Sequence, residues 1–218
     1  MSSTPVQTET ADSLQIVIDE ILSVIEQDRE KEIITRRFGL FDRKETLEQI
    51  GELLGITRER VRQLEKAILI RLKRAAEGNR VPSIQSFEKK IITTLTEMGR
   101  AARVQDLADK LTTKTSNQLA KARVAFIAEL SPNLTVVSEN DNYHQAVGIA
   151  EYGNEKQIKT HVDEIVKAIK KHGEPVTVEE LHDQLTFEHP SHIEALASIS
   201  KLLAHLDSRW GLAKWPTV

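Results

Sequence analysis

One short stretch near the N-terminus constrains the fold most, because it contains two apolar-periodic segments, each preceded by a threonine, with a glycine between them. Thr46 followed by Gln49 is the pattern of a capping box, and it predicts a helix over 47–54. Gly55 ends that helix, and Thr57 can cap the next one. Two helices joined by such a short turn form a helix-turn-helix, so we expect a small helical bundle here.

Two more helices are expected ahead of this pair. Residues 12–26 place aliphatic side chains at helical spacing, which predicts an amphipathic helix. Asp28 can cap a second helix over 29–38, and Gly39 supplies the left-handed residue that ends it. After a disordered start, the part of the chain from residue 12 to residue 77 is therefore expected to be built from α-helices and short connections.

The charge of the chain is concentrated in the second helix of the helix-turn-helix. The whole sequence has a formal net charge of −3. The segment from Arg58 to Arg74 nevertheless holds seven basic and two acidic residues, a local net charge of +5. Such a cluster is typical of nucleic-acid binding, although a solvated helix face is the alternative interpretation of charge alone.

The spacing of residues in this helix separates a polar face from an apolar one. Val61, Leu64 and Ile68 are expected to turn inward. The exposed sector at the start of the helix carries Arg58, Glu59, Arg62 and Gln63. Arginine can bond guanine, glutamate can accept from cytosine and glutamine can pair with adenine, so this set suits base reading in the major groove. For any one of these residues, a solvated i,i+4 pair is the alternative.

The order of the motifs carries a family resemblance. The motifs are RRFGL at 36–40, TLEQIG at 46–51, GITRERVRQ at 55–63 and LE at 64–65. As an ordered set they resemble region 4 of the bacterial σ70 family. The resemblance implies that the four exposed polar residues read a −35-type element of double-stranded promoter DNA. It also implies contact with RNA polymerase core through the flap of the β subunit.

A second set of residues is expected to contact DNA phosphates and so to set affinity without setting sequence. Thr46 is foremost a cap, but in the σ70 family the helix N-terminus that it opens also approaches phosphate. Arg36 and Arg37 could instead only cover the helix surface. The full candidate set is Arg36, Arg37, Thr46, Thr57, Arg60, Lys66, Arg71, Lys73 and Arg74.

The sequence departs from the σ70 family in two respects. The later half of the recognition helix is more apolar than usual, and we interpret Ile70 as packing against the following module, with an altered activator-binding surface as the alternative. In addition, only about 27 residues precede the motif, so the upstream promoter-melting region of a complete σ factor is not expected.

The rest of the chain is predicted to form two small α+β units of similar topology after a linker at 77–86. The first should have helices at 87–98, 105–111 and 116–130, with strands at 101–104, 134–137 and 143–147. The second should have helices at 158–172, 178–185 and 192–206, with strands at 175–178 and 208–215. Three helices with a terminal hairpin are the winged-helix pattern, so we expect a mainly α chain divided into a disordered segment 1–11, a helix-turn-helix domain 12–77 and winged-helix domains 84–148 and 155–218.

The C-terminal unit carries a second resemblance. SRWGLAKWP at 208–216 and EPVTVEEL at 174–181 are similar to the HARE-HTH winged-helix fold of the δ subunit of Gram-positive RNA polymerase. Residues from Val81 onward hold 16 basic and 18 acidic residues, a net charge of −2. We therefore expect these units to bind protein, including other transcription factors, although weak phosphate contacts are the alternative.

Other classes of function find little support in the sequence. No phosphate-binding glycine loop and no catalytic triad occurs, so neither catalysis nor a small-molecule ligand is expected. The chain has no cysteine, and His182, His189 and His192 lack convincing metal-ligand spacing, so no cofactor or metal is expected. The sequence also shows no membrane-spanning run, and we expect a bacterial cytoplasmic protein associated with the nucleoid.

Two functional hypotheses follow. In the first, the helix-turn-helix reads promoter DNA as an accessory factor for transcription initiation, and the C-terminal units bind protein. In the second, the chain binds the polymerase flap or a σ factor and modulates transcription without specific DNA reading.

Overall fold

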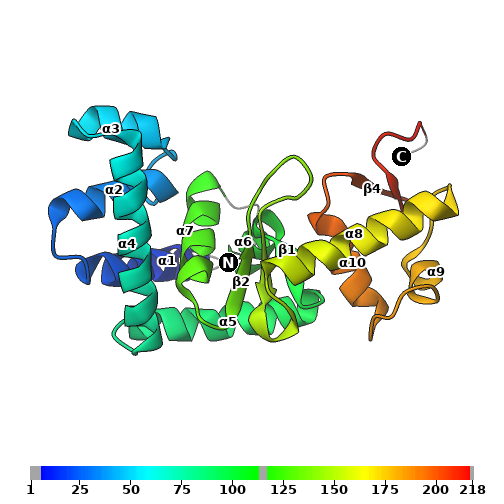
Figure 1. The fold of residues 1–218 in the computed structure, drawn as a ribbon. Coiled ribbons are helices and arrows are strands. Elements are labelled where there is room, and N and C mark those ends of the chain that lie inside the picture. Colours follow the sequence, from blue (N-terminus) through cyan, green and yellow to red (C-terminus); the bar gives the residue numbers. More distant parts are fainter. Residues whose placement is uncertain (1–5, 113–116, 217–218) are drawn as a thin grey trace. The chain divides into compact units, whose positions relative to one another are not determined.

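The computed structural model describes residues 6–112 and 117–216, and it confirms the mainly helical composition expected from the sequence (Figure 1). The described residues fall into two compact units. Residues up to Lys90 and those between Ala108 and Pro132 form the first unit, while Ile91–Leu107 and the residues from Asn133 onward form the second. The chain therefore leaves the first unit, returns to it and leaves it again. The three-part division into 12–77, 84–148 and 155–218 stays a prediction.

The first unit is built from helices alone. The complete helices are α1 (Val6–Ser23), α2 (Asp28–Phe38), α3 (Leu47–Leu54), α4 (Arg58–Glu77) and α7 (Gln118–Leu130), and the start of α5 (Pro82–Met98) completes the unit. The expected helix-turn-helix is formed by α3 and α4 (Figure 1).

Three boundaries that were predicted from the sequence for the helices of this unit differ from the structure. Helix α1 begins at Val6, so residues 6–11 are helical, and the disorder expected at 1–5 lies outside the described residues. Asp28 is the first residue of α2, not its cap, and Gln27 at the cap position makes no side-chain capping bond. The linker predicted at 77–86 is shorter in the structure, where residues 78–81 connect α4 to α5 and α5 already begins at Pro82.

The segment around residue 81 was predicted to be a linker because most of its residues are polar or turn-forming, although two of its aliphatic side chains are buried. Val81 and Ile84 are each only 1% exposed. Packing of these side chains gives the segment a reason to be ordered that its Gly, Asn, Pro and Ser residues conceal in the sequence.

Helix α7 is part of the core of the first unit, although it follows α4 by some forty residues. It contacts α1, α2 and α4. Every residue from Ala122 to Ala128 is buried, so α7 is surrounded on almost all sides. The rings of Phe126 and Phe38 pack with their centroids 4.8 Å apart.

The second unit combines helices with two small antiparallel sheets. Its helices are the end of α5, the start of α6 (Val104–Thr112), α8 (Glu155–His172), α9 (Val178–His182) and α10 (Pro190–Ile199), with a 3-10 turn at Ala150–Tyr152. Its strands are β1 (Ala101–Arg103), β2 (Leu134–Val137), β3 (Ala146–Ile149), β4 (Leu203–Leu206) and β5 (Arg209–Leu212). The first sheet has the order β1-β3-β2, and β4 pairs with β5.

Two predictions for the C-terminal region need correction. The helix expected over 192–206 ends at Ile199, and the chain continues as strand β4. Of the expected strand 175–178, only Val176 pairs, in an isolated bridge with Trp210. Aliphatic residues continue through both regions, so periodicity alone could not distinguish the end of the helix from the start of the strand.

One hydrophobic core joins the two regions that were expected to be separate winged-helix domains. Ala101, Val137 and Ala146 from the earlier region lie in the same cluster as Ile165 and Ile199 from the later one. Helix α10 also packs against β1. None of the helices in residues 6–112 and 117–216 combines the length and the apolar composition needed to cross a membrane.

Candidate nucleic-acid interface

The local interactions that hold the helix-turn-helix are those predicted from its threonines. The Thr46 hydroxyl accepts from the amide of Gln49 at 3.1 Å, and the Gln49 side chain accepts from the amide of Thr46 at 2.8 Å, which completes a capping box. The hydroxyl of Thr57 accepts from the amide of Arg60 at 3.1 Å. Both helices are therefore capped by their own sequence.

Two glycines set the geometry of the turn. Gly55 caps the C-terminus of α3 with a φ of 66°, and its amide N–H donates a hydrogen bond to the carbonyl oxygen of Gly51. A Cβ atom at Gly51 would lie 2.7 Å from the main-chain oxygen of Ile56. Because no real Cβ approaches an oxygen so closely, Gly51 permits the close passage of the turn over α3 that positions the start of α4.

The four predicted base-reading residues lie together on the exposed start of α4. Arg62 forms two hydrogen bonds to the carboxylate of Glu59, at 2.9 Å from Nε and 2.7 Å from Nη2. Gln63 contacts the same carboxylate at 3.5 Å. Arg62 and Glu59 keep more than half of their side-chain surface exposed, at 52% and 59%. The structure thus brings these residues into one exposed polar cluster.

Charge within this cluster is mutually stabilised. The hydrogen bonds from Arg62 lower the pKa of the Glu59 carboxyl below its usual value, and the same bonds raise the pKa of Arg62. Both groups are charged at neutral pH. Because both side chains are exposed to solvent, the pair contributes little to stability and can rearrange at small cost.

Arg58 joins the two helices of the motif. Its guanidinium lies 3.0 Å from the carboxylate of Glu48 on α3, and both side chains are more than half exposed. Glu48 was not identified from the sequence, since its only signal is its place in the first turn of α3. The pair presents Arg58 beside the exposed cluster of Glu59, Arg62 and Gln63.

The predicted phosphate-contacting residues divide into two groups according to whether they form an ion pair within the described residues. Arg36 and Arg37 belong to the group that does. Arg36 pairs with Glu32 at 3.0 Å and Glu45 at 3.1 Å, and these bonds raise its pKa. Arg37 pairs with Glu65 of α4 at 3.3 Å. These pairs connect α2 to α4 and to the loop before α3, which favours a structural role for both arginines.

Residues further along α4 show the same division. Arg71 lies 2.6 Å from Glu30, and Lys73 lies 2.9 Å from Glu129 of α7. In residues 6–112 and 117–216, the structure shows no ion pair for Lys66, Arg60 or Arg74, all of which are exposed.

Helix geometry separates these cations further. Nine residues, about 2.5 turns, separate Arg71 from Arg62, which places Arg71 on the opposite side of α4. Lys66 follows Arg62 by about one turn and lies on nearly the same side. Lys66 is therefore better placed than Arg71 to meet a phosphate of DNA that contacts the start of α4.

The expected packing of Ile70 is wrong. Its side chain is 42% exposed, and it borders a shallow groove along α4 together with Lys66, Leu69 and Lys73. Ile68 and Leu72 in the same half of α4 are buried, whereas Ile70 stays on the outer surface of the helix. Separately, no three His, Asp or Glu side chains in the described ranges form a group that could hold a metal ion.

Comparison with known proteins agrees with this geometry. Residues 27–74 match the family Sigma-70, region 4. Over 52 residues the chain is 48% identical to RNA polymerase sigma factor sigB of Arabidopsis thaliana, which covers 23% of this chain and 9% of that protein. Over 79 residues it is 34% identical to RNA polymerase sigma factor SigA of a Bacillus species, covering 36% of this chain and 21% of that protein. No solved structure matches the chain.

The resemblance to σ70 region 4 is thus confirmed for the helix-turn-helix. The match spans about a tenth and a fifth of the length of the two relatives. Because these relatives come from a plant and a bacterium, a bacterial origin stays a prediction, as does the similarity of the C-terminal region to the HARE-HTH fold. Sigma-70 region 4 is a DNA-binding domain of transcription proteins and not an enzyme family.

Proposed function

We propose that this protein binds double-stranded promoter DNA at a −35-type element through α3 and α4 and acts as an accessory factor with RNA polymerase. The observation that carries the proposal is the exposed cluster of Arg58, Glu59, Arg62 and Gln63 at the start of a capped helix. These side chains offer both hydrogen-bond donors and acceptors at the N-terminal end of α4, and this is the end of the second helix that a helix-turn-helix places in the major groove.

Phosphate contacts are proposed from residues around this cluster. Lys66 and Arg60 are exposed and lie close to the base-reading residues along the helix. Thr46 and Thr57 open helices whose first amides can meet an anion. The ion-paired candidates Arg36, Arg37, Arg71 and Lys73 would have to exchange a carboxylate for a phosphate, and Arg74 is more distant along α4.

The C-terminal part is proposed to bind protein. Both regions run in the order helix, strand or bridge, helix, helix and hairpin, which supports a winged-helix relationship. In that topology, the third helices would be α7 and α10. The first is buried from Ala122 to Ala128, and the second contains no Lys or Arg. Neither has the exposed basic surface that a groove-reading helix needs, which leaves α4 as the proposed reader.

The proposal is tested with a labelled duplex that bears a −35-like element, compared with a scrambled duplex over a series of salt concentrations. Binding should weaken steeply with salt, and Arg62→Ala should reduce the preference for the specific duplex by about 1–3 kcal/mol. Lys167→Ala on α8, which removes an exposed cation far along the chain, is the matched control. Equal affinity of the natural protein for both duplexes would exclude sequence reading.

The alternative function is binding to the polymerase flap or a σ factor without DNA reading. The exposed Ile70 and the half-buried Leu69 on α4 favour a protein contact on that helix. A pull-down with RNA polymerase core tests it. Retention of polymerase by the Arg62→Ala variant, together with loss of retention by Ile70→Ser, would support this alternative.

A further inference from the structure

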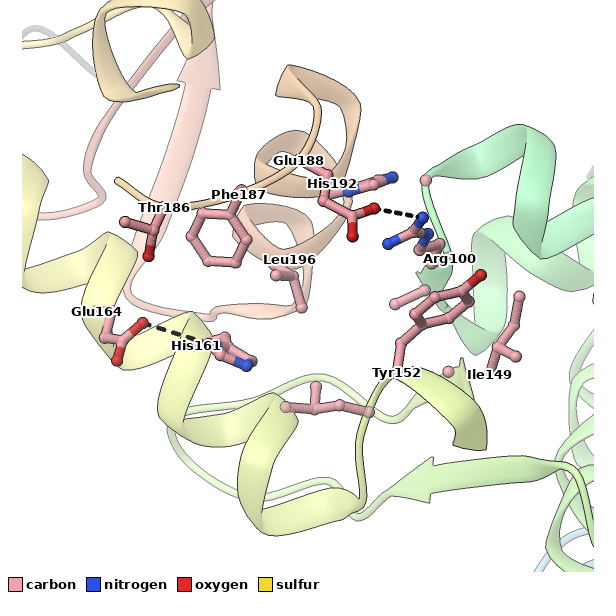
Figure 2. A pocket seen from close by; sticks show the side chains of 14 residues that line it. Arg100, Ile149, Tyr152, His161, Glu164, Thr186, Phe187, Glu188, His192 and Leu196 are labelled. Carbon is pink, nitrogen blue, oxygen red and sulfur yellow. Dashed lines mark hydrogen bonds and ion pairs between the residues drawn. The ribbon is translucent and has the colours of Figure 1, made fainter. Parts of the chain in front are cut away.

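A pocket of about 310 Å³ lies within the second unit (Figure 2). Aliphatic side chains of Ile149, Ile158 and Leu196 form much of its lining, and Phe187 forms one wall. Figure 2 shows Arg100 on the opposite side of the opening from Phe187. The volume is at the lower end of the range for binding pockets, so it suits one large side chain with its adjoining backbone.

Arg100 is held at this pocket in an unusual backbone conformation. Its φ is 76°, in the left-handed region that residues other than glycine rarely adopt. Its guanidinium lies over the ring of Tyr152, with 3.8 Å between Cζ and the ring centroid. Strain of this kind persists where surrounding interactions favour it, and it often marks a functional position.

The guanidinium has unused hydrogen-bonding capacity. Arg100 Nη2 lies 2.7 Å from the carboxylate of Glu188, whose side chain is 73% exposed, whereas that of Arg100 is only 28% exposed. An arginine has five donors in a planar fork, so a second carboxylate can approach the same group. Because Glu188 is largely exposed to solvent, its hold on Arg100 is weak, and an incoming carboxylate can also replace Glu188.

Among the titratable side chains that line the pocket, Arg100 is the permanently charged cation. Burial lowers the pKa of His192, and the nearby Arg100 charge lowers it further, which keeps this ring neutral at pH 7. Glu164 pairs with His161 at 3.3 Å on α8, away from Arg100 (Figure 2). Glu188 is the remaining carboxylate, and it already contacts Arg100.

We propose that this pocket binds an acidic segment of a protein partner, which inserts a large apolar side chain against Leu196 and Phe187 and places an adjacent carboxylate on Arg100. Arginine and tyrosine beside an apolar pocket are the residues that most often dominate protein–protein binding energy. The proposal rests on the proposed function only in assigning protein binding to the C-terminal part.

The experiment uses the full chain labelled with ¹⁵N and three probes that carry the same phenylethyl group. These are 3-phenylpropionate, its uncharged amide, and 2-phenylethylamine, whose charge is opposite. The carboxylate should shift the amide signals of Arg100, Gly148 and Phe187 and bind about tenfold more tightly than either other probe, since only it forms a charge-assisted bond to Arg100. Equal binding of the three probes, preference for the amine, or no shift at millimolar concentration would overturn the proposal.

Two variants test the role of each charge. Arg100→Asn removes the guanidinium while keeping a residue that tolerates the left-handed conformation, and it should weaken carboxylate binding about tenfold. Glu188→Gln removes the internal competitor and should tighten binding about twofold to fivefold. Lys167→Asn is the control and should change nothing. If Glu188→Gln weakened binding of the carboxylate, the proposed exchange would be wrong.

The outcome can be separated from that of DNA reading. Arg100→Asn should leave the affinity for the −35-like duplex unchanged, while Arg62→Ala should leave carboxylate binding unchanged. If the natural protein did not prefer the −35-like duplex, the proposed function would be wrong and the pocket proposal would stand. If the natural protein did not bind 3-phenylpropionate, the pocket proposal would be wrong and the proposed function would stand.

Discussion

The side chain of Arg123 on α7 donates a hydrogen bond from Nε to the main-chain oxygen of Leu40, 2.9 Å away and 83 positions earlier in the chain. A second bond at 2.7 Å joins its Nη2 to the side-chain oxygen of Gln15 on α1. Arg123 is only 8% exposed, and this burial lowers its pKa. One buried guanidinium therefore connects α7 to α1 and to the loop that follows α2.

Replacing this guanidinium should destabilise the first unit. Arg123→Met keeps an unbranched apolar stem but leaves the Leu40 oxygen without its charged donor, so the free energy of unfolding should fall by about 1.5–3 kcal/mol. Chemical denaturation followed by circular dichroism measures the loss. Lys121→Met on the same helix is the control, because Lys121 is partly exposed. Equal stability of the two variants would show that the Arg123 bonds contribute little.

Gly51→Ala should disturb the turn of the helix-turn-helix. The added methyl group would lie 2.7 Å from the Ile56 oxygen, so the start of α4 has to shift relative to α3. We expect a loss of about 1–3 kcal/mol of stability and weaker binding to the specific duplex. Glu52→Ala, at the next and exposed position of α3, provides the control. A Gly51→Ala protein with natural stability and DNA affinity would argue against this close packing.

Glu59→Gln should change DNA binding in opposite ways for specific and scrambled sequences. The substitution removes a negative charge from the exposed cluster and releases Arg62 from its bidentate pair. Affinity for scrambled DNA should rise severalfold, while selectivity should fall because a neutral amide oxygen is a weaker acceptor for the cytosine amino group than a carboxylate. Fluorescence anisotropy with both duplexes measures the two changes. A parallel fall in both affinities would mean that the pair has only a structural role.

The salt dependence of binding can distinguish the two groups of cations. Lys66→Gln should reduce the slope of log affinity against log salt by about 1, as expected for one lost phosphate contact. Arg36→Gln should instead lower stability and leave the slope unchanged, because Arg36 is paired with Glu32 and Glu45. If the slope fell equally in both variants, Arg36 would have to exchange its carboxylates for phosphate on binding.

The second unit should show a tyrosine that ionises late. Burial and the hydrogen bond from the Tyr143 hydroxyl to Asp163, at 2.7 Å, raise the pKa of Tyr143 to about 12. The raised value means that this tyrosine adds stability below its unfolded pKa of about 10, and that the contribution is lost as pH rises through about 12. Ultraviolet titration should show this late step in the natural protein, and Tyr143→Phe should remove it. A complete titration of both tyrosines near pH 10 would contradict the assignment.

Much of the helix-turn-helix could be predicted from the sequence because its determinants are local. Thr46, Gln49 and Thr57 cap helices within three residues, and Gly39 and Gly55 take the left-handed conformation that ends them. The exposure of the proposed base-reading cluster followed from helical periodicity, which depends only on spacing along the chain. Strand β2, the helix end at Gly173 and the matched region of the σ family were predictable for the same reason.

What the tertiary structure decided involves residues distant in sequence. No local pattern shows that α7 completes the first unit or that Val176 pairs with Trp210. The pairs of Arg36 with Glu45 and of Arg71 with Glu30 likewise join residues that helical spacing does not bring together. The same holds for the pocket around Arg100, whose lining comes from five separate stretches of the chain. Helix caps and hydrophobic periodicity depend on residues a few positions apart, so they can be predicted from the sequence. Burial, long-range ion pairing and pocket shape depend on which distant segments come into contact when the chain folds.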